Sequence, residues 1–240
     1  MTERGRRRAV LGDVLVYDED VDTLLPGKWL NDQVIAYLLG MFDARRESSD
    51  GVVVLEPSMT FTAGMVGEAE LLREMLSVAR TSGATPLAEQ LGVADLVLMP
   101  VNNNEDASIA GGGSHWSLLA FRRQGGQGGK PRFEHYDSCD NANGPQALAI
   151  ARAMAPLLME RVGHLQLMRM TTPRQANGHD CGAYLLAIAE LLCTARSGGG
   201  EPPVGGALSE AMRALTPQAI TAKRDEWLNV IREAMCIPSG

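Results

Sequence analysis

The chain has 240 residues, of which 45% are hydrophobic and 21% charged, and its formal net charge is −7 at pH 7. A chain of this length can bury a core without disulfide or metal support, and its acidic balance argues against nucleic acid and anionic membranes as main partners. No apolar run approaches the ~18 residues of a membrane helix and no signal peptide is visible, so we expect residence in the cytoplasm or the nucleus, where thiols stay reduced.

The first half of the chain is predicted to be a tail, a strand and helices. Residues 1–10 are expected to form a disordered basic tail, with a nuclear import signal as the alternative for the run at 4–8, and residues 11–240 a single domain. A short strand is predicted at 14–17 and a loop at 18–28. Apolar side chains at helical spacing predict one helix that begins near Asn31 or Asp32 and another over 68–80. The second helix is expected to turn inward Leu71, Leu72, Met75, Leu76 and Ala79.

The second half alternates between strand and helix patterns. Apolar runs predict strands at 95–101, 116–121, 132–136 and 164–170. Helices are predicted at 145–162, 181–195 and 217–235, and the Gly- and Pro-rich stretch at 197–206 is expected to be a mobile loop. This order predicts an α+β fold, in which helices pack against a small mixed or antiparallel sheet whose strands follow mainly sequence order.

A cysteine, a histidine and an aspartate occupy positions that suit nucleophilic catalysis. Cys181 lies at the predicted start of a helix, where unpaired amides and the macrodipole favour an anion such as a thiolate. His115 begins one predicted strand and Asp137 ends the next, so antiparallel pairing through a hairpin at 122–131 brings the two side chains together. The set predicts a Cys181 nucleophile, a His115 base and an Asp137 that orients the imidazole ring.

Nearby polar residues allow an additional role and a competing chemistry. Gln175 carries an amide N–H that, with the backbone N–H of Cys181, can stabilise an oxyanion. A metal site is the competing interpretation, and its possible ligands are His115, His135, Asp137, Cys139 and Cys181. These residues lack the short paired spacing that places two ligands on one turn, so no metal is predicted.

Four stretches of the chain resemble the sentrin/SUMO-specific (Ulp-type) cysteine proteases. They read WLND at 29–32, GSHWSLL at 113–119, HYDS at 135–138 and QANGHDCG at 175–182. The order His, Asp, Cys is that of this family, whereas papain has its cysteine first. Within the family, three features are similar to the deneddylase branch, the sentrin-specific protease 8 type. They are VNNN at 101–104, LTPQAITAKRDEW at 215–227 and the lack of a long N-terminal extension. The Gly-rich insertions at 124–129 and 197–206 depart from the family and fall in predicted loops.

This resemblance implies a papain-like fold and cleavage after the C-terminal Gly-Gly of a ubiquitin-like modifier, in conjugates or in precursors. It also implies that Trp29 and Trp116 roof a channel over the Gly-Gly tail, and that Asp32 contacts the modifier, caps the first helix or does both. The implied partners are the neddylation modifier, or else SUMO, and conjugates such as cullins. No cofactor is implied, and a monomer is expected because no interface signal is visible.

Three other functions are compatible with parts of the sequence. A SUMO protease would have the same catalytic residues. An acetyltransferase with a His-acid-Cys site would need an acyl-CoA pocket and usually a basic patch, which an acidic chain disfavours. An inactive modifier-binding module would not need the complete set of three side chains.

Overall fold

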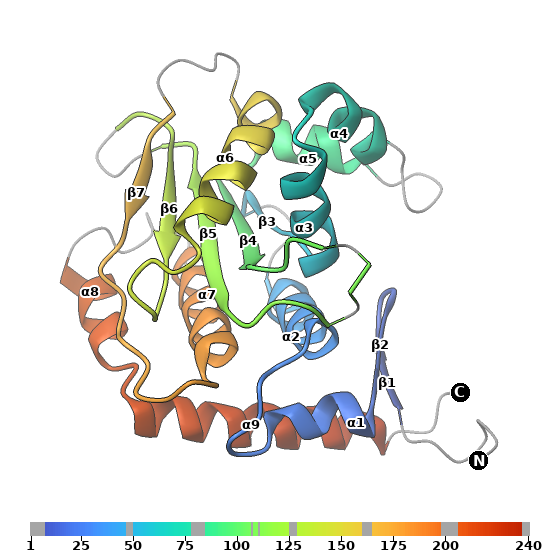
Figure 1. The fold of residues 1–240 in the computed structure, drawn as a ribbon, viewed down its shortest axis with the longest axis vertical. Helices are drawn as coiled ribbons and strands as arrows, with labels where there is room; N and C mark the ends of the chain where they lie inside the picture. Colours follow the sequence, from blue (N-terminus) through green and yellow to red (C-terminus); the bar gives the residue numbers. More distant parts are fainter. Residues whose placement is uncertain are drawn as a thin grey trace.

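The computed structural model describes residues 8–46, 50–77, 85–106, 108–109, 111–124, 129–159, 165–197 and 206–236. Its centre is a five-stranded sheet in the order β3-β4-β5-β6-β7 (Figure 1). These strands are Val52–Val54 (β3), Leu96–Asn102 (β4), Trp116–Arg122 (β5), Arg132–Tyr136 (β6) and Leu167–Arg169 (β7). Strands β4, β5 and β6 pair antiparallel, and β3 and β7 join the two edges in parallel. The predicted sequential, mixed sheet and the α+β class are confirmed.

The central strands are apolar on both faces because helices cover both sides of the sheet. In β4, Leu96 and Leu98 belong to one core cluster, whereas Val97 and Met99 belong to the other. Successive side chains of a strand point to opposite faces, so an unbroken apolar run indicates a strand buried on both sides. Helices α2 (Asp32–Ala44) and α7 (Cys181–Ser197) pack on the first face, and α3 (Pro57–Val66) and α6 (Gly144–Leu158) on the second.

A long C-terminal helix, α9 (Pro217–Met235), lies against α7 along one end of the molecule (Figure 1). The side chain of Thr216 caps it by accepting a hydrogen bond from the backbone N–H of Ala219, and Pro217 stands at its first position. Both are ordinary helix-start signals, which is why this helix was predictable to its ends. Trp227 anchors α9 in the first core cluster, where its ring lies 6.3 Å from that of Phe42.

The N-terminal segment differs from the predicted tail and loop. Arg8–Leu11 forms β1, which pairs with β2 (Val14–Tyr17), so the expectation of a disordered tail through residue 10 is wrong for its last three residues. Ala9 is buried in the core, and this burial stabilises β1. The arginines next to it make the segment look like a solvated tail in the sequence. Residues 1–7 lie outside the described residues.

The stretch predicted as a loop at 18–28 contains two short helices. These are α1 (Asp18–Val21) and the 3-10 helix η2 (Asp22–Leu24). Their buried members, Val21 and Leu24, are spaced by one helical turn, and this short apolar pattern is hidden among four acidic residues. The helix predicted at Asn31 or Asp32 is confirmed as α2, with Asn31 as its cap.

The helix predicted over 68–80 is shorter and turned differently. It is α4 (Ala69–Leu76), and residues 78–84 lie outside the described residues. Leu72 is buried as expected, but Leu71 and Met75 are 45% and 49% exposed, so the prediction that both point inward is wrong. The apolar residues of α4 therefore cover more of the helix surface than the part that packs against the rest of the protein.

Several elements escaped prediction or changed length. Strand β3 and helices α3, α5 (Leu87–Val93) and α8 (Gly206–Arg213) were not predicted. The helix predicted at 145–162 ends at Leu158, and the strand predicted at 164–170 is confined to β7. Residues 198–205, the core of the predicted mobile loop, lie outside the described residues. Within the described part of the chain, no helix combines the length and apolarity needed to cross a membrane.

Candidate active site

The structure brings His115, Asp137 and Cys181 together at one end of the sheet. His115 directly precedes β5 and Asp137 directly follows β6, and antiparallel pairing of the two strands places both at the same end. The Nε2–H of His115 donates to Oδ1 of Asp137 at 2.7 Å, and both side chains are buried. Cys181 is the first residue of α7, as predicted, and it lies close enough to His115 to raise the pKa of the imidazole. An imidazole has two ring nitrogens, so Nδ1 is the one left for the sulfur when Nε2 bonds to Asp137.

The three side chains support one another electrostatically. Burial alone lowers the pKa of His115, but the hydrogen bonds to Asp137 and Cys181 and the charges of both outweigh it and raise that pKa to about 10. Burial pushes the pKa of Asp137 upward, but hydrogen bonds from His115 and from two backbone N–H groups hold it below its usual value. At neutral pH the site therefore holds an imidazolium between a carboxylate and the sulfur, the arrangement that favours a thiolate nucleophile.

A tight turn after β6 holds the aspartate. Asp137 Oδ1 accepts from the backbone N–H of Cys139 at 2.8 Å, and Oδ2 accepts from that of Asn143 at 3.0 Å. Asp140 and Asn141, which lie inside the turn, adopt positive φ angles of 51° and 66°. Aspartate and asparagine tolerate this left-handed region better than other non-glycine residues, so the local sequence suits the turn.

Asn143 is a positioning residue that sequence reasoning missed. Its buried Nδ2 donates to the backbone oxygens of Val101 and His115, both at 3.2 Å, and to Oγ of Ser117 at 3.1 Å. The amide therefore joins β4, β5 and the turn that carries Asp137. In the sequence, an asparagine before Gly144 indicates only a helix cap, and the side chain does not in fact cap α6.

Replacing Asn143 with alanine is expected to lower turnover by about 10-fold to 100-fold, because misplaced catalytic groups are costly even when the chemistry is intact. The loss of the amide leaves two buried carbonyls without this donor, so we also expect a loss of about 1–3 kcal/mol in the free energy of unfolding. Steady-state kinetics and urea unfolding measure the two effects. The exposed Asn229 on α9 supplies the control variant Asn229→Ala. Full turnover in Asn143→Ala would contradict the positioning role.

Hydrogen bonds to Asn103 also fix the backbone at His115. Oδ1 of Asn103 accepts from the backbone N–H groups of Ser114 and His115, at 2.7 and 3.0 Å. Gly113 has a φ of +83°, and a Cβ there would lie 1.9 Å from Oδ1 of Asn102, so no other residue fits. The segments at 101–104 and 111–113 thus together hold the backbone of His115 in place.

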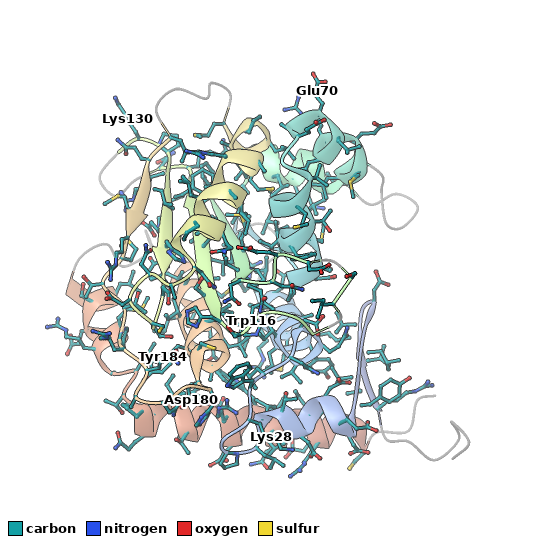
Figure 2. All side chains as sticks on the ribbon, in the orientation of Figure 1. Lys28, Glu70, Trp116, Lys130, Asp180 and Tyr184 are labelled. Atoms are coloured by element: carbon teal, nitrogen blue, oxygen red, sulfur yellow. The ribbon has the colours of Figure 1, made fainter. Side chains whose placement is uncertain are left out.

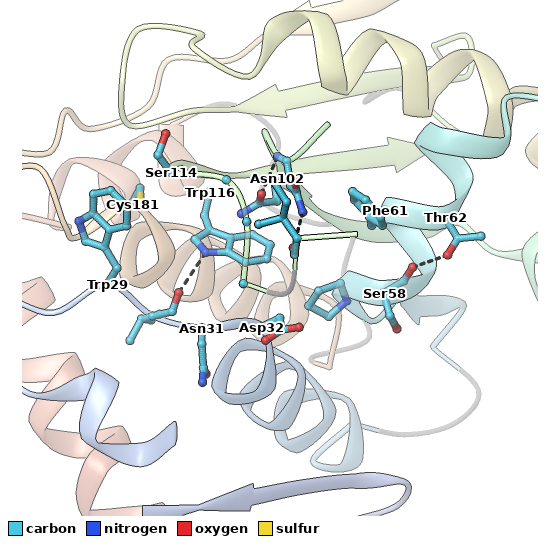
Figure 3. Close-up of a pocket in the computed structure, with 17 residues that line it drawn as sticks. Trp29, Asn31, Asp32, Ser58, Phe61, Thr62, Asn102, Ser114, Trp116 and Cys181 are labelled. Atoms are coloured by element: carbon cyan, nitrogen blue, oxygen red, sulfur yellow. Dashed lines mark hydrogen bonds between the residues drawn. The ribbon is translucent and has the colours of Figure 1, made fainter. Parts of the chain in front are cut away.

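A cavity of about 430 Å³ opens beside the sulfur (Figure 3). Trp29, Trp116 and Cys181 line one end of it, and helix α3 lines the other. Trp29 is 52% exposed, whereas Trp227, the third tryptophan of the chain, is 1% exposed. Trp116 is half-buried and its Nε1–H donates to the backbone oxygen of Leu30 at 3.1 Å. A tryptophan that packs in the core is largely buried, whereas half of the Trp29 side chain is open to solvent. Trp29 is therefore available to a ligand.

Asp32 and Gln175 are the remaining predicted residues. Asp32 lines it and is exposed, and the helix cap is Asn31, whose Oδ1 accepts from the backbone N–H of Val34. Gln175 lies in the loop before α7, where Oε1 accepts from Oγ of Ser138 at 2.8 Å and Nε2 donates to the backbone oxygen of Asn177 at 2.6 Å. An amide nitrogen carries two N–H groups, so one donor of Gln175 is left for a substrate.

Two of the residues considered as metal ligands, His135 and Cys139, contribute no side chain to the His115–Asp137–Cys181 set. His135 uses both ring nitrogens in hydrogen bonds of 2.9 Å, with Oγ of Ser117 and Oδ1 of Asn141, and Cys139 is exposed. Among the described residues, no three His, Cys, Asp or Glu side chains are arranged to hold a metal ion.

The site contains the three groups that acyl transfer requires. These are a nucleophilic sulfur, a base that takes the proton of the thiol, and a carboxylate that orients the base.

Comparison with known proteins identifies the family. The model of the Ulp1 protease family, C-terminal catalytic domain, matches residues 28–200. NEDD8-specific protease 1 of Arabidopsis thaliana is 30% identical over 224 residues, covering 93% of this chain and 91% of that protein. Sentrin-specific protease 8 of Homo sapiens is 29% identical over 226 residues, covering 91% and 93%.

A solved structure has the same fold. The C-terminal Ulp1 protease domain in complex with Smt3, the yeast ortholog of SUMO, superimposes with a TM-score of 0.61 at 18% identity, covering 98% of this chain and 91% of that one. The family match contains His115, Asp137 and Cys181, the three side chains that the fold assembles. We conclude that the chain belongs to the Ulp1 protease family and is a cysteine protease.

Proposed function

We propose that this protease cleaves after the C-terminal Gly-Gly of a NEDD8-type modifier. The observation that carries the proposal is the position of Cys181, which lies beside a buried His115–Asp137 pair at the end of the cavity flanked by Trp29 and Trp116. The similarity to NEDD8-specific protease 1, which extends over 93% of the chain, supports NEDD8 as the modifier.

The proposed chemistry is hydrolysis through a thioester. The Cys181 thiolate attacks the carbonyl carbon of the terminal glycine, and His115 protonates the leaving amine. His115 then takes a proton from water, which attacks the thioester and releases the modifier and the thiolate. Asp137 holds the imidazole in the orientation that these steps require. The free amide N–H of Gln175 and the backbone N–H of Cys181 are proposed to stabilise the oxyanion of each tetrahedral intermediate.

The cavity offers a physical basis for glycine selection. A Gly-Gly tail has no Cβ atoms, so it can pass between two indole rings where any bulkier residue would collide. Trp29 and Trp116 are proposed to form this passage. Asp32 lines the same cavity and is exposed, and we propose that it contacts the modifier through its carboxylate.

The proposed substrates are NEDD8 conjugates such as neddylated cullins, and NEDD8 precursors. The protein is proposed to act as a monomer in the cytoplasm or the nucleus. SUMO is the second candidate modifier, because the Ulp1 domain that superimposes on this chain is described in complex with a SUMO ortholog.

Modifier probes test the proposal directly. NEDD8, SUMO and ubiquitin, each bearing a C-terminal propargyl amide, are incubated in parallel with the protein and with Cys181→Ala. We expect rapid labelling of Cys181 by the NEDD8 probe and none of the alanine variant. Faster labelling by the SUMO probe would replace NEDD8 with SUMO. A folded protein that reacts with no probe would refute the proposal, and acetylation of Cys181 by acetyl-CoA would then indicate an acetyltransferase.

A further inference from the structure

A buried arginine on the C-terminal helix reaches the back of the active site. Arg224 of α9 is 4% exposed. Its Nε–H donates to Oδ1 of Asp180 at 2.9 Å, and Nη2 donates to the backbone oxygens of Lys28 at 2.7 Å and His179 at 3.2 Å. Nη1 donates to three further backbone oxygens, those of Thr23, Leu24 and Leu25. Asp180 and Lys28 both lie next to α9 in Figure 2.

The acceptors belong to the two chain segments that bear the site. Lys28 directly precedes Trp29, and Asp180 directly precedes Cys181. One rigid guanidinium therefore fixes the tryptophan segment relative to the start of α7. A lysine cannot reproduce this arrangement, because its ammonium is a single point with three donors, whereas the planar fork of arginine has five.

Arg224 also changes the charge next to the nucleophile. Asp180 directly precedes Cys181 in the sequence, and a negative charge near the sulfur opposes a thiolate. Within the described residues, the carboxylate bonds to Arg224 and to Nδ2 of Asn177, and it accepts from no backbone N–H of the first turn of α7. The guanidinium neutralises this carboxylate and interacts favourably with Cys181 itself.

The charged groups near the sulfur thus form two ion pairs. His115 and Asp137 lie at the end of the sheet, and Arg224 of α9 pairs with Asp180, the residue before Cys181. The half-buried ring of His179 also approaches Asp180, with Nε2 3.8 Å from Oδ1. The mechanism proposed above uses His115 and Asp137, but it does not use Arg224 and Asp180.

We propose that Arg224 is a positioning residue of the active site: it sets the spacing between Trp29 and Cys181, and it cancels the charge of Asp180 beside the nucleophile. The first role rests on the proposed cleavage of a Gly-Gly tail. The second role concerns the sulfur alone and does not depend on any modifier.

Four variants separate these roles. Arg224→Lys keeps the charge and loses the fork, Arg224→Gln loses both, and the double variant Asp180→Asn/Arg224→Gln removes both charges. Arg232→Gln is the matched control, because Arg232 lies on the same helix and, among the described residues, makes only an exposed ion pair with Asp22 at 3.7 Å. Mass spectrometry measures the rate of iodoacetamide alkylation at Cys181 over a series of pH values. Steady-state kinetics on a modifier-linked fluorophore gives kcat and KM separately, and thermal denaturation shows which variants fold.

We expect Arg224→Lys to keep the wild-type alkylation profile and to lower kcat/KM by up to about 100-fold, mainly through KM. In Arg224→Gln alkylation at neutral pH is slower by about 10-fold or more, because the charge of Asp180 is no longer cancelled beside the thiolate. The double variant returns alkylation to the wild-type rate, but its KM stays high. Arg232→Gln matches the wild type in both measurements.

Two results would overturn the inference. One is that every folded Arg224 variant keeps the wild-type alkylation profile and KM and differs only in melting temperature, since Arg224 is then merely structural. The other is that the double variant alkylates like Arg224→Gln, since the charge of Asp180 is then not what Arg224 cancels. Because alkylation needs no modifier, it tests the charge role even if the protease proves to prefer another substrate.

Discussion

Replacing Cys181 with alanine is expected to abolish hydrolysis, by a factor on the order of 10⁶ in kcat, while binding of the modifier is retained. In the proposed mechanism the sulfur is the atom that attacks the carbonyl, and alanine has no nucleophile to replace it. Alanine occupies less volume than cysteine and suits the start of a helix, so the cavity and its tryptophans keep their places. A fluorogenic modifier substrate measures turnover, and calorimetry measures binding of the uncleaved modifier.

Cys139 provides the matched control for this experiment. It is an exposed cysteine two residues beyond Asp137, and it serves the site through its backbone N–H alone. Cys139→Ser keeps that N–H and should retain wild-type turnover. Significant hydrolysis by Cys181→Ala, or an equal loss in Cys139→Ser, would mean that Cys181 is not the nucleophile.

Asp137→Asn is expected to lower kcat by about 10⁴-fold with the fold intact. The amide can present an N–H to Nε2 of His115, and the ring then carries its proton on Nδ1, where it cannot accept one from the thiol. The variant also loses the hydrogen bond and the charge that raise the pKa of His115 to about 10, while the burial that lowers it remains.

The pH dependence of the residual activity follows from that change. In the wild type, His115 is an imidazolium below its raised pKa of about 10 and loses its proton only as the pH rises through that value. In Asp137→Asn the proton leaves at lower pH, so the alkaline fall of kcat should move to lower pH. A profile of kcat between neutral and strongly alkaline pH measures the shift.

The control for this variant is Asp140→Asn, which changes an exposed carboxylate in the same turn. Asp140 forms an ion pair with Arg169 on the surface and has a positive φ that asparagine also tolerates. We expect wild-type kinetics from it. An Asp137→Asn enzyme with wild-type kcat and an unmoved alkaline limb would remove Asp137 from the catalytic set.

The elements that were predictable carry their own local signals. Strand β6 and helix α9 have the bounds that the sequence predicts, and the pair Thr216 and Pro217 marks the start of α9. Helix α3 has no such apolar periodicity, because its apolar and polar residues are not gathered on separate faces of the helix. It forms between β4 and α6, so its stability comes from contacts that local sequence does not encode.

The candidate site divides in the same way. His115, Asp137 and Cys181 were predictable as a group from the sequence, because a hairpin and a helix start are local features whose geometry follows from neighbouring residues. The contacts from which roles for Asn143 and Arg224 are inferred become visible only in the tertiary structure. Their partners lie on segments far away in the chain, and a hydrogen bond between distant segments leaves no periodicity or spacing in the sequence. It exists only after packing has placed a donor beside buried carbonyls that need one.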